Sequence, residues 1–155
     1  MGFGSKILII EARFYDDIAD ALVRGAIEEL EAAGAGFKRI IVPGIFEIPA
    51  VIRFHVRAME LRAAEEHFTG YITLGCAIRG ETDHYDHICR ETMRGIQDLV
   101  INNSLALGNG VLTVHNKAQA LARLPNNKRN FGAQAARAVL RMIEIKRELN
   151  LISGN

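Results

Sequence analysis

GYITLGCAI at residues 70–78 has the composition of a strand buried on both faces. Three runs of the same kind lie on either side of it in the chain: KILIIEA at 6–12, FKRIIVP at 37–43 and GNGVLTV at 108–114. Each run is followed by a segment of helical length. Alternating strands and helices are typical of a parallel sheet with helices on both faces, joined by right-handed crossovers. The sequence therefore predicts an α/β fold, a three-layer sandwich around a parallel four-stranded sheet.

The expected helices follow from apolar periodicity and end signals. Asp16 and Asp17 are expected to cap the first helix, and Gly34 suits a left-handed stop at its end. Between them, Ile18, Leu22, Ala26, Leu30 and Ala33 recur at helical spacing. Further helices are expected at 46–66, 82–103, 115–124 and 131–149.

The last expected helix carries two apolar stripes. One consists of Ala136, Val139, Leu140 and Ile143, and the other of Ala138, Met142, Ile145 and Leu149. At about 100° per residue the stripes lie on different sides of the helix. One stripe fits a contact with another subunit. The alternative is a helix wedged between the sheet and a neighbouring helix of the same chain.

Length and charge limit the possible functions. A chain of 155 residues with 49% hydrophobic content is expected to form a single domain over 1–155. Its 19 basic and 18 acidic residues give no basic footprint for nucleic acid, and its apolar runs are too short for a membrane span or a signal peptide. We expect a cytoplasmic protein in which the two cysteines, Cys76 and Cys89, are buried thiols.

The candidate site lies at the carboxyl ends of the strands, where ligands bind in open parallel sheets. Strand 70–78 runs into Arg79, Gly80 and Glu81, and Thr82 can cap a helix whose free N–H groups would accept an anion such as a substrate phosphate. Glu81 and Asp83 oppose this reading unless their carboxylates point outward. A capped helix without a ligand is the simpler alternative.

His84 falls in the first turn of that helix and can exchange protons near neutral pH. A lone histidine is more often structural. A zinc site of His84, His87 and Cys89 is a weaker alternative, because Cys89 would be turned away from the two histidines.

Two other loops offer polar and aromatic groups at the same edge. In PGIFEIP at 43–49, Gly44 allows close approach of a ligand, and Glu47 can accept hydrogen bonds from a polyol or simply favour a helix start. Phe14 and Tyr15 offer an aromatic face for a planar ring, although aromatic residues here are as often part of the core.

Taken in order, RFYD at 13–16, PGIFEIP at 43–49, GCAIRGETDHYDH at 75–87 and GNGVLT at 108–113 resemble the motif set of the lumazine synthase family. The resemblance covers nearly the whole chain and implies a flavodoxin-like strand order. It also implies a transferase of riboflavin biosynthesis that condenses 5-amino-6-(D-ribitylamino)uracil with 3,4-dihydroxy-2-butanone 4-phosphate. Phosphate and water leave, and no cofactor or metal is implied.

The resemblance assigns a role to each candidate residue. His84 matches the proton-transfer residue and Phe14 the aromatic that stacks on the pyrimidine. Arg123 matches a phosphate-binding arginine that the family takes from an adjacent subunit. The remaining matches are Ile45, Phe46 and Glu47 for the ribityl chain, Cys76, Ala77 and Ile78 for the ring, and Glu81 with Thr82 for the phosphate loop.

Three positions depart from the usual family pattern. Ile45 stands where alanine is usual and should narrow the ribityl side of the pocket. Asn109 replaces an aromatic residue that covers the pyrimidine in many members. Phe131 replaces a lysine that lies near the ring carbonyls, and Lys128 or Arg129 of the same loop can take the place of that lysine. These changes predict weaker affinity for the uracil than is typical.

Family members assemble as pentamers, pairs of pentamers or sixty-subunit shells. The segment LPNNKRNF at 124–131 lacks the glycine- and lysine-rich loop of many shell-forming members, which favours an isolated homopentamer. Alternatives from other classes are a non-catalytic flavin- or lumazine-binding oligomer and a purely structural shell protein. A flavodoxin-like electron carrier is disfavoured, because EARFYDD lacks the Ser/Thr/Gly cluster of a phosphate loop.

Overall fold

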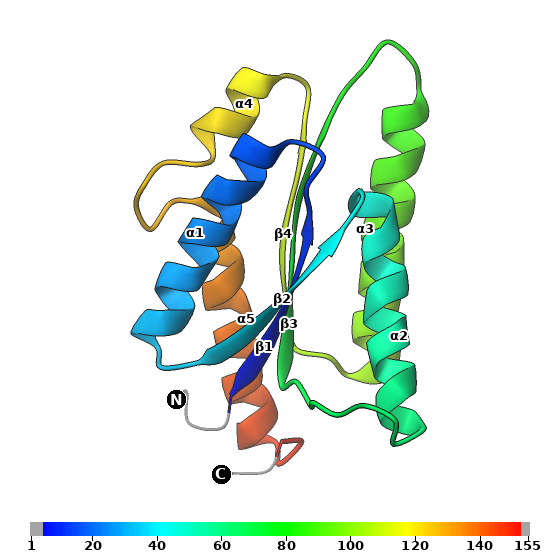
Figure 1. Cartoon of the computed structure of the whole chain (residues 1–155), viewed down its shortest axis with the longest axis vertical. Helices are drawn as coiled ribbons and strands as arrows, with labels where there is room; N and C mark the ends of the chain where they lie inside the picture. The colour runs from blue at the N-terminus through cyan, green and yellow to red at the C-terminus, as the bar shows by residue number, and fades with distance from the viewer. Residues whose placement is uncertain (1–4, 153–155) are drawn as a thin grey trace.

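A computed structural model describes residues 5–152, which form a four-stranded sheet between two layers of helices (Figure 1). All strand pairs are parallel, and the strand order is β2-β1-β3-β4. The predicted three-layer α/β sandwich and its flavodoxin-like order are therefore confirmed. The elements are β1 (Lys6–Ala12), α1 (Asp16–Ala32), β2 (Gly36–Val42), η1 (Ile45–Glu47), α2 (Ile48–Glu60), β3 (Gly70–Ile78), α3 (His84–Asn103), β4 (Leu107–Val114), α4 (Lys117–Ala122) and α5 (Phe131–Glu148).

The sheet has a separate hydrophobic core on each face. In β1, Ile7 and Ile9 belong to the core under α1 and α5, whereas Leu8 and Ile10 belong to the core under α2 and α3. Figure 1 shows these two helix pairs on opposite sides of the sheet. Burial on both faces explains why the two inner strands, β1 and β3, are almost continuously apolar rather than alternating.

Helix α5 lies very close to the edge strand β4. A Cβ atom on Gly108 would be 1.9 Å from the carbonyl oxygen of Ala135, so only glycine fits at this position without a shift of backbone. The same closeness places Val139 and Ile143 of α5 within the core on this face. The glycine-rich start of β4 is thus a packing feature of the fold.

The four strands begin and end within one residue of their predicted limits, but the start of α1 differs. Its N-cap is Tyr15, and Asp16 and Asp17 lie in the first turn, so neither aspartate caps the helix as predicted. Carboxylates in a first turn still stabilise a helix through its dipole. Gly34, with φ of 71°, provides the left-handed stop that the sequence predicted.

The prediction of one helix over 46–66 is wrong. Ile45–Glu47 forms a short 3₁₀ turn and α2 ends at Glu60, after which Arg62 adopts a left-handed φ of 56°. Beyond this turn, Glu66 makes exposed ion pairs with Lys6 and Lys38, and these hydrogen bonds lower the pKa of Glu66 to about 2. The left-handed Arg62, the hydrogen bonds of Ala63 and Ala64 to the carbonyl of Ala58 and the return of the chain to β3 therefore end the helix despite the helix propensity of 61–66.

The two apolar stripes of α5 have different environments. Val139, Ile143 and the rest of the first stripe are buried, as predicted. In the second stripe, Met142 and Leu149 are 41% and 63% exposed in the isolated chain. Helix α5 packs between the sheet and α1, as the alternative expected, and the second stripe stays largely uncovered in the single chain. None of the helices within residues 5–152 is long and apolar enough to cross a membrane.

Candidate active site

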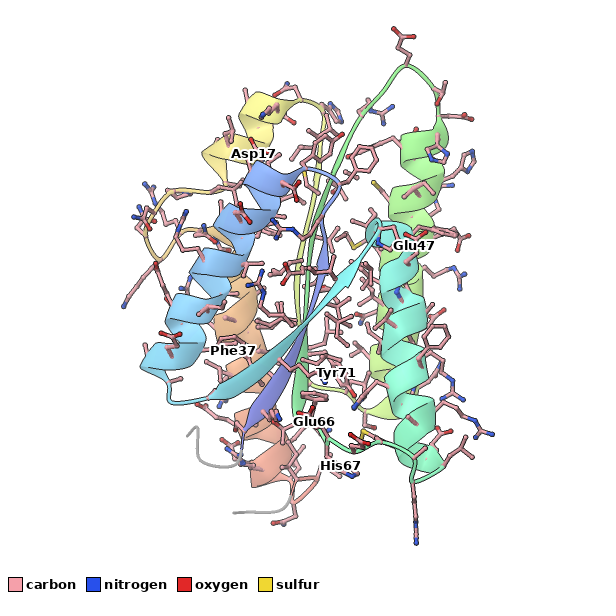
Figure 2. The ribbon with its side chains drawn as sticks, viewed as in Figure 1. Asp17, Phe37, Glu47, Glu66, His67 and Tyr71 are labelled. Carbon is pink, nitrogen blue, oxygen red and sulfur yellow. The ribbon has the colours of Figure 1, made fainter. Side chains whose placement is uncertain are left out.

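A cavity of about 600 Å³ lies at the carboxyl ends of the strands. Its walls come from the β1–α1 loop, the segment between β2 and α2, the end of β3 and the start of α3. In Figure 2, Asp17 and Glu47 mark this end of the sheet, and Tyr71, Glu66 and His67 mark the opposite end. Nine of the twelve predicted site residues line the cavity: Phe14, Ile45, Phe46, Glu47, Cys76, Ala77, Ile78, Thr82 and His84.

The β1–α1 loop presents an aromatic ring at the cavity. Phe14 is 74% exposed, and its ring meets that of Tyr15 edge-on at 5.0 Å. The loop is anchored by Arg13, whose guanidinium binds the fully buried carboxylate of Glu11 at 2.9 Å and also binds Asp16. A fixed loop with a free aromatic face is suited to stacking on a planar heterocycle.

The turn that begins with Gly44 supplies one carboxylate and one apolar wall. Ile45 is buried and packs so closely on β3 that a Cβ on Gly75 would lie 2.7 Å from its Cγ2 atom. Glu47 is exposed, and its carboxylate has no hydrogen-bond partner within residues 5–152. Such an oxygen pair is available to accept hydrogen bonds from hydroxyl groups of a ligand.

The end of β3 forms the wall between these loops. Cys76, Ala77 and Ile78 line the cavity there, and burial raises the pKa of the Cys76 thiol to about 11. Burial also raises the pKa of Cys89 on the neighbouring helix. Both thiols are therefore protonated at neutral pH, which argues against a cysteine nucleophile at this site.

His84 is the first residue of α3 and lies on the cavity wall, exposed to solvent. Its backbone N–H donates to the Thr82 hydroxyl at 3.3 Å. The N-cap is Asp83, one residue later than predicted, and its carbonyl accepts from the N–H groups of Asp86 and His87. These bonds occupy most of the first-turn donors, so an anion would have to bind the backbone of the preceding loop as well.

Known proteins of one family match this chain over nearly its whole length. The family described as 6,7-dimethyl-8-ribityllumazine synthase matches residues 4–147. The chain belongs to this family. A 6,7-dimethyl-8-ribityllumazine synthase of Paramagnetospirillum magneticum is 56% identical over 149 residues, covering 96% of this chain and 99% of its own. 6,7-Dimethyl-8-ribityllumazine synthase 1 of Rhizobium meliloti is 50% identical, covering 92% of both chains, and a synthase of Afipia carboxidovorans is 48% identical, covering 94% of this chain and 88% of its own.

Three residues that the lumazine synthase motifs indicate are not among those lining the cavity of the single chain. Glu81 is exposed in the loop before α3. Asn109 lies in the middle of β4, where its Oδ1 accepts from the Thr73 hydroxyl at 2.8 Å. Arg123 follows α4, exposed, and donates to the carbonyl of Gln119 at 2.8 Å. The single chain therefore brings together the ring and ribityl part of the predicted site without Arg123.

The zinc alternative gains no support from the geometry. His87 pairs with the carboxylate of Asp83 at 3.3 Å. Over residues 5–152, no three His, Cys, Asp or Glu side chains are grouped so that they could hold a metal ion.

Tyr85 and Ile88 also line the cavity, and neither was predicted to do so. Both lie on the same helix as His84, and Ile88 is one turn further along. Residues four apart share a face of a helix, so the spacing from His84 to Ile88 would have identified Ile88 as a cavity residue.

Proposed function

We propose that the chain condenses 5-amino-6-(D-ribitylamino)uracil with 3,4-dihydroxy-2-butanone 4-phosphate to form 6,7-dimethyl-8-ribityllumazine, phosphate and water. The observation that carries the proposal is the meeting of His84 with Phe14 and Glu47 in one cavity, from three separate segments of the chain. Membership of the lumazine synthase family supports the same reaction.

The binding roles follow from the chemistry of each wall. The exposed ring of Phe14 stacks on the pyrimidine, and the free carboxylate of Glu47 accepts hydrogen bonds from ribityl hydroxyls. The backbone of Cys76, Ala77 and Ile78 contacts the edge of the ring. Ile45, with Phe46, bounds the ribityl chain, and its bulk limits the space there.

His84 moves protons between the reacting groups. The amine of the uracil attacks the ketone of the butanone phosphate, and water leaves as the imine forms. Phosphate is then eliminated, the enol that this leaves becomes a carbonyl, and the ribitylamino nitrogen attacks that carbonyl. A second water leaves as the ring closes. The nucleophile belongs to the substrate, so the protein has no need of a Schiff-base lysine, and an imidazole at the cavity wall provides general acid–base catalysis. The reaction as proposed uses no cofactor and no metal.

The phosphate end of the site is proposed to lie between subunits. The backbone of Glu81 and Thr82 and an arginine, Arg123 of a neighbouring copy, bind the phosphate. This arrangement fits the exposed position of Arg123 after α4 and the exposed second stripe on α5.

We propose a homopentamer that acts in the cytoplasm, where reducing conditions suit the free thiols of Cys76 and Cys89.

The test is to follow lumazine absorbance and fluorescence after mixing the purified protein with both substrates. We expect formation well above the spontaneous rate, a large loss in His84→Ala, and no loss in His67→Ala, a matched control at the opposite end of the sheet (Figure 2). If neither the wild type nor His67→Ala accelerated the reaction, a non-catalytic lumazine- or flavin-binding oligomer would be favoured.

The oligomeric state is tested by light scattering, which should give a mass of five times 17.1 kDa. A megadalton particle would refute the isolated pentamer.

A further inference from the structure

Arg79 and Asp86 flank the segment that contains His84 and the loop before it. Arg79 directly follows β3, and its N–H donates to the carbonyl of Val114 at the end of β4 at 2.9 Å. Asp86 lies in the first turn of α3. The Nη2 atom of Arg79 and the Oδ1 atom of Asp86 are 2.6 Å apart, so an ion pair joins the two ends of the segment 80–85.

Arg79 makes a second contact with the same turn of α3. Its guanidinium lies over the ring of Tyr85, 4.8 Å from the ring centre. The rings of Tyr85 and His115 meet nearly at right angles, with centres 6.4 Å apart, and the Tyr85 hydroxyl lies near Thr113 and Cys89. Tyr85 is thus held between the ends of β3 and β4, and it lines the cavity next to His84.

The loop between these anchors has few other constraints. Glu81, Thr82 and Asp83 are exposed, and a Cβ on Gly80 would meet no atom within 4 Å. The remaining bonds of 80–84, including that of Thr82 to the N–H of His84, lie within the loop and the first turn of α3. They fix the local shape of the segment but not its position relative to the sheet.

We propose that Arg79 is a positioning residue for the condensation, holding the loop 80–83 and the imidazole of His84 against the cavity through its contacts with Asp86 and Tyr85. The inference rests on the proposed function of His84. Both charged side chains are about 40% exposed, so the pair adds little to overall stability. The catalytic rate depends far more on the position of the imidazole than stability does, since displacing a reacting group by about 1 Å can reduce a rate about a hundredfold.

The experiment compares Arg79→Ala, Asp86→Ala and the double variant with the intact protein. Arg94→Ala is the matched control, because Arg94 makes exposed ion pairs with Glu91 and Asp98 further along the same helix. We expect kcat to fall at least about tenfold in Arg79→Ala, with KM for the ribitylaminouracil and the unfolding midpoint unchanged. Because Asp86 acts only through its contact with Arg79, the double variant should match Arg79→Ala within a factor of about two.

Three results would overturn the inference. The first is an unchanged kcat in Arg79→Ala while His84→Ala is impaired. The second is a double variant whose loss equals the product of the single losses. The third is wild-type behaviour of Asp86→Ala while Arg79→Ala shows a raised KM for the butanone phosphate and weaker inhibition by inorganic phosphate, which would make Arg79 a direct ligand. An inactive wild type would instead overturn the proposed function itself.

Discussion

Gly108→Ala places a single methyl group where β4 touches the backbone of α5. The added carbon would lie 1.9 Å from the oxygen and 2.7 Å from the carbonyl carbon of Ala135. Neither atom belongs to a side chain that can rotate away, so the strand and the helix have to separate. Overpacking a core costs about 1–3 kcal/mol, and we expect the upper end, about 3 kcal/mol, because backbone must move. For a chain of this length that corresponds to a fall of about 6–12 °C in Tm.

The matched control is Gly36→Ala in the edge strand β2. Its Cβ would meet only the carbonyl oxygen of Ser5, at an ordinary 3.7 Å, and neither Gly36 nor Gly108 has a positive φ. We expect a change of at most about 1 kcal/mol, in the stabilising direction, because alanine reduces the freedom of the unfolded chain. Tm is measured by calorimetry at one protein concentration, since assembly shifts it. Equal Tm values for the two variants would refute the packing of α5 on β4.

Two further predictions concern the half-buried His55 and the fully buried Glu11, both away from the cavity. Burial lowers the pKa of His55, which bonds through Nδ1 to the Tyr71 hydroxyl at 2.6 Å, so below about pH 6.5 the unfolded chain binds more protons than the folded one. The free energy of unfolding should fall as the pH drops from about 7 to 5, and urea titrations should show a weaker pH dependence in His55→Gln. An unchanged pH dependence in the variant would mean that other groups cause it. Arg39→Met removes a bidentate partner of the fully buried Glu11 and should cost about 1–3 kcal/mol in urea unfolding. The neighbouring Lys38→Met loses only an exposed pair and should cost at most about 1 kcal/mol, so equal losses would contradict the role given to Glu11.

The fold was largely predictable because local pattern and tertiary burial agree. The segment 70–78 is apolar at successive positions and becomes one of the two inner strands, buried on both faces. The end of α2 was not predictable from the residues nearby. Ala63, Ala64 and Glu65 favour helix, but the chain turns at Arg62 and brings Phe68 and Tyr71 into the core under α2 and α3, with residues far away in the sequence.

The cavity was predictable where a residue lies in the segment that follows a strand end, as Phe14, Glu47 and His84 do. Tyr85 was missed because its role depends on Arg79 and on the end of β4, which come together only in the folded chain. Asn109 was assigned from a motif alone, and in the single chain its side chain is occupied by Thr73.

The most direct test of the central claim, that His84 acts on the chemistry at this cavity rather than on binding, separates the two steps. The Kd of the ribitylaminouracil is measured by titration for the wild type and His84→Ala, and lumazine formation is followed in a single turnover with saturating butanone phosphate. We predict equal Kd values and a rate constant about 10²–10⁴-fold lower in the variant, the usual contribution of general acid–base catalysis. An unchanged single-turnover rate, or a loss explained wholly by weaker binding of the uracil, would contradict this account.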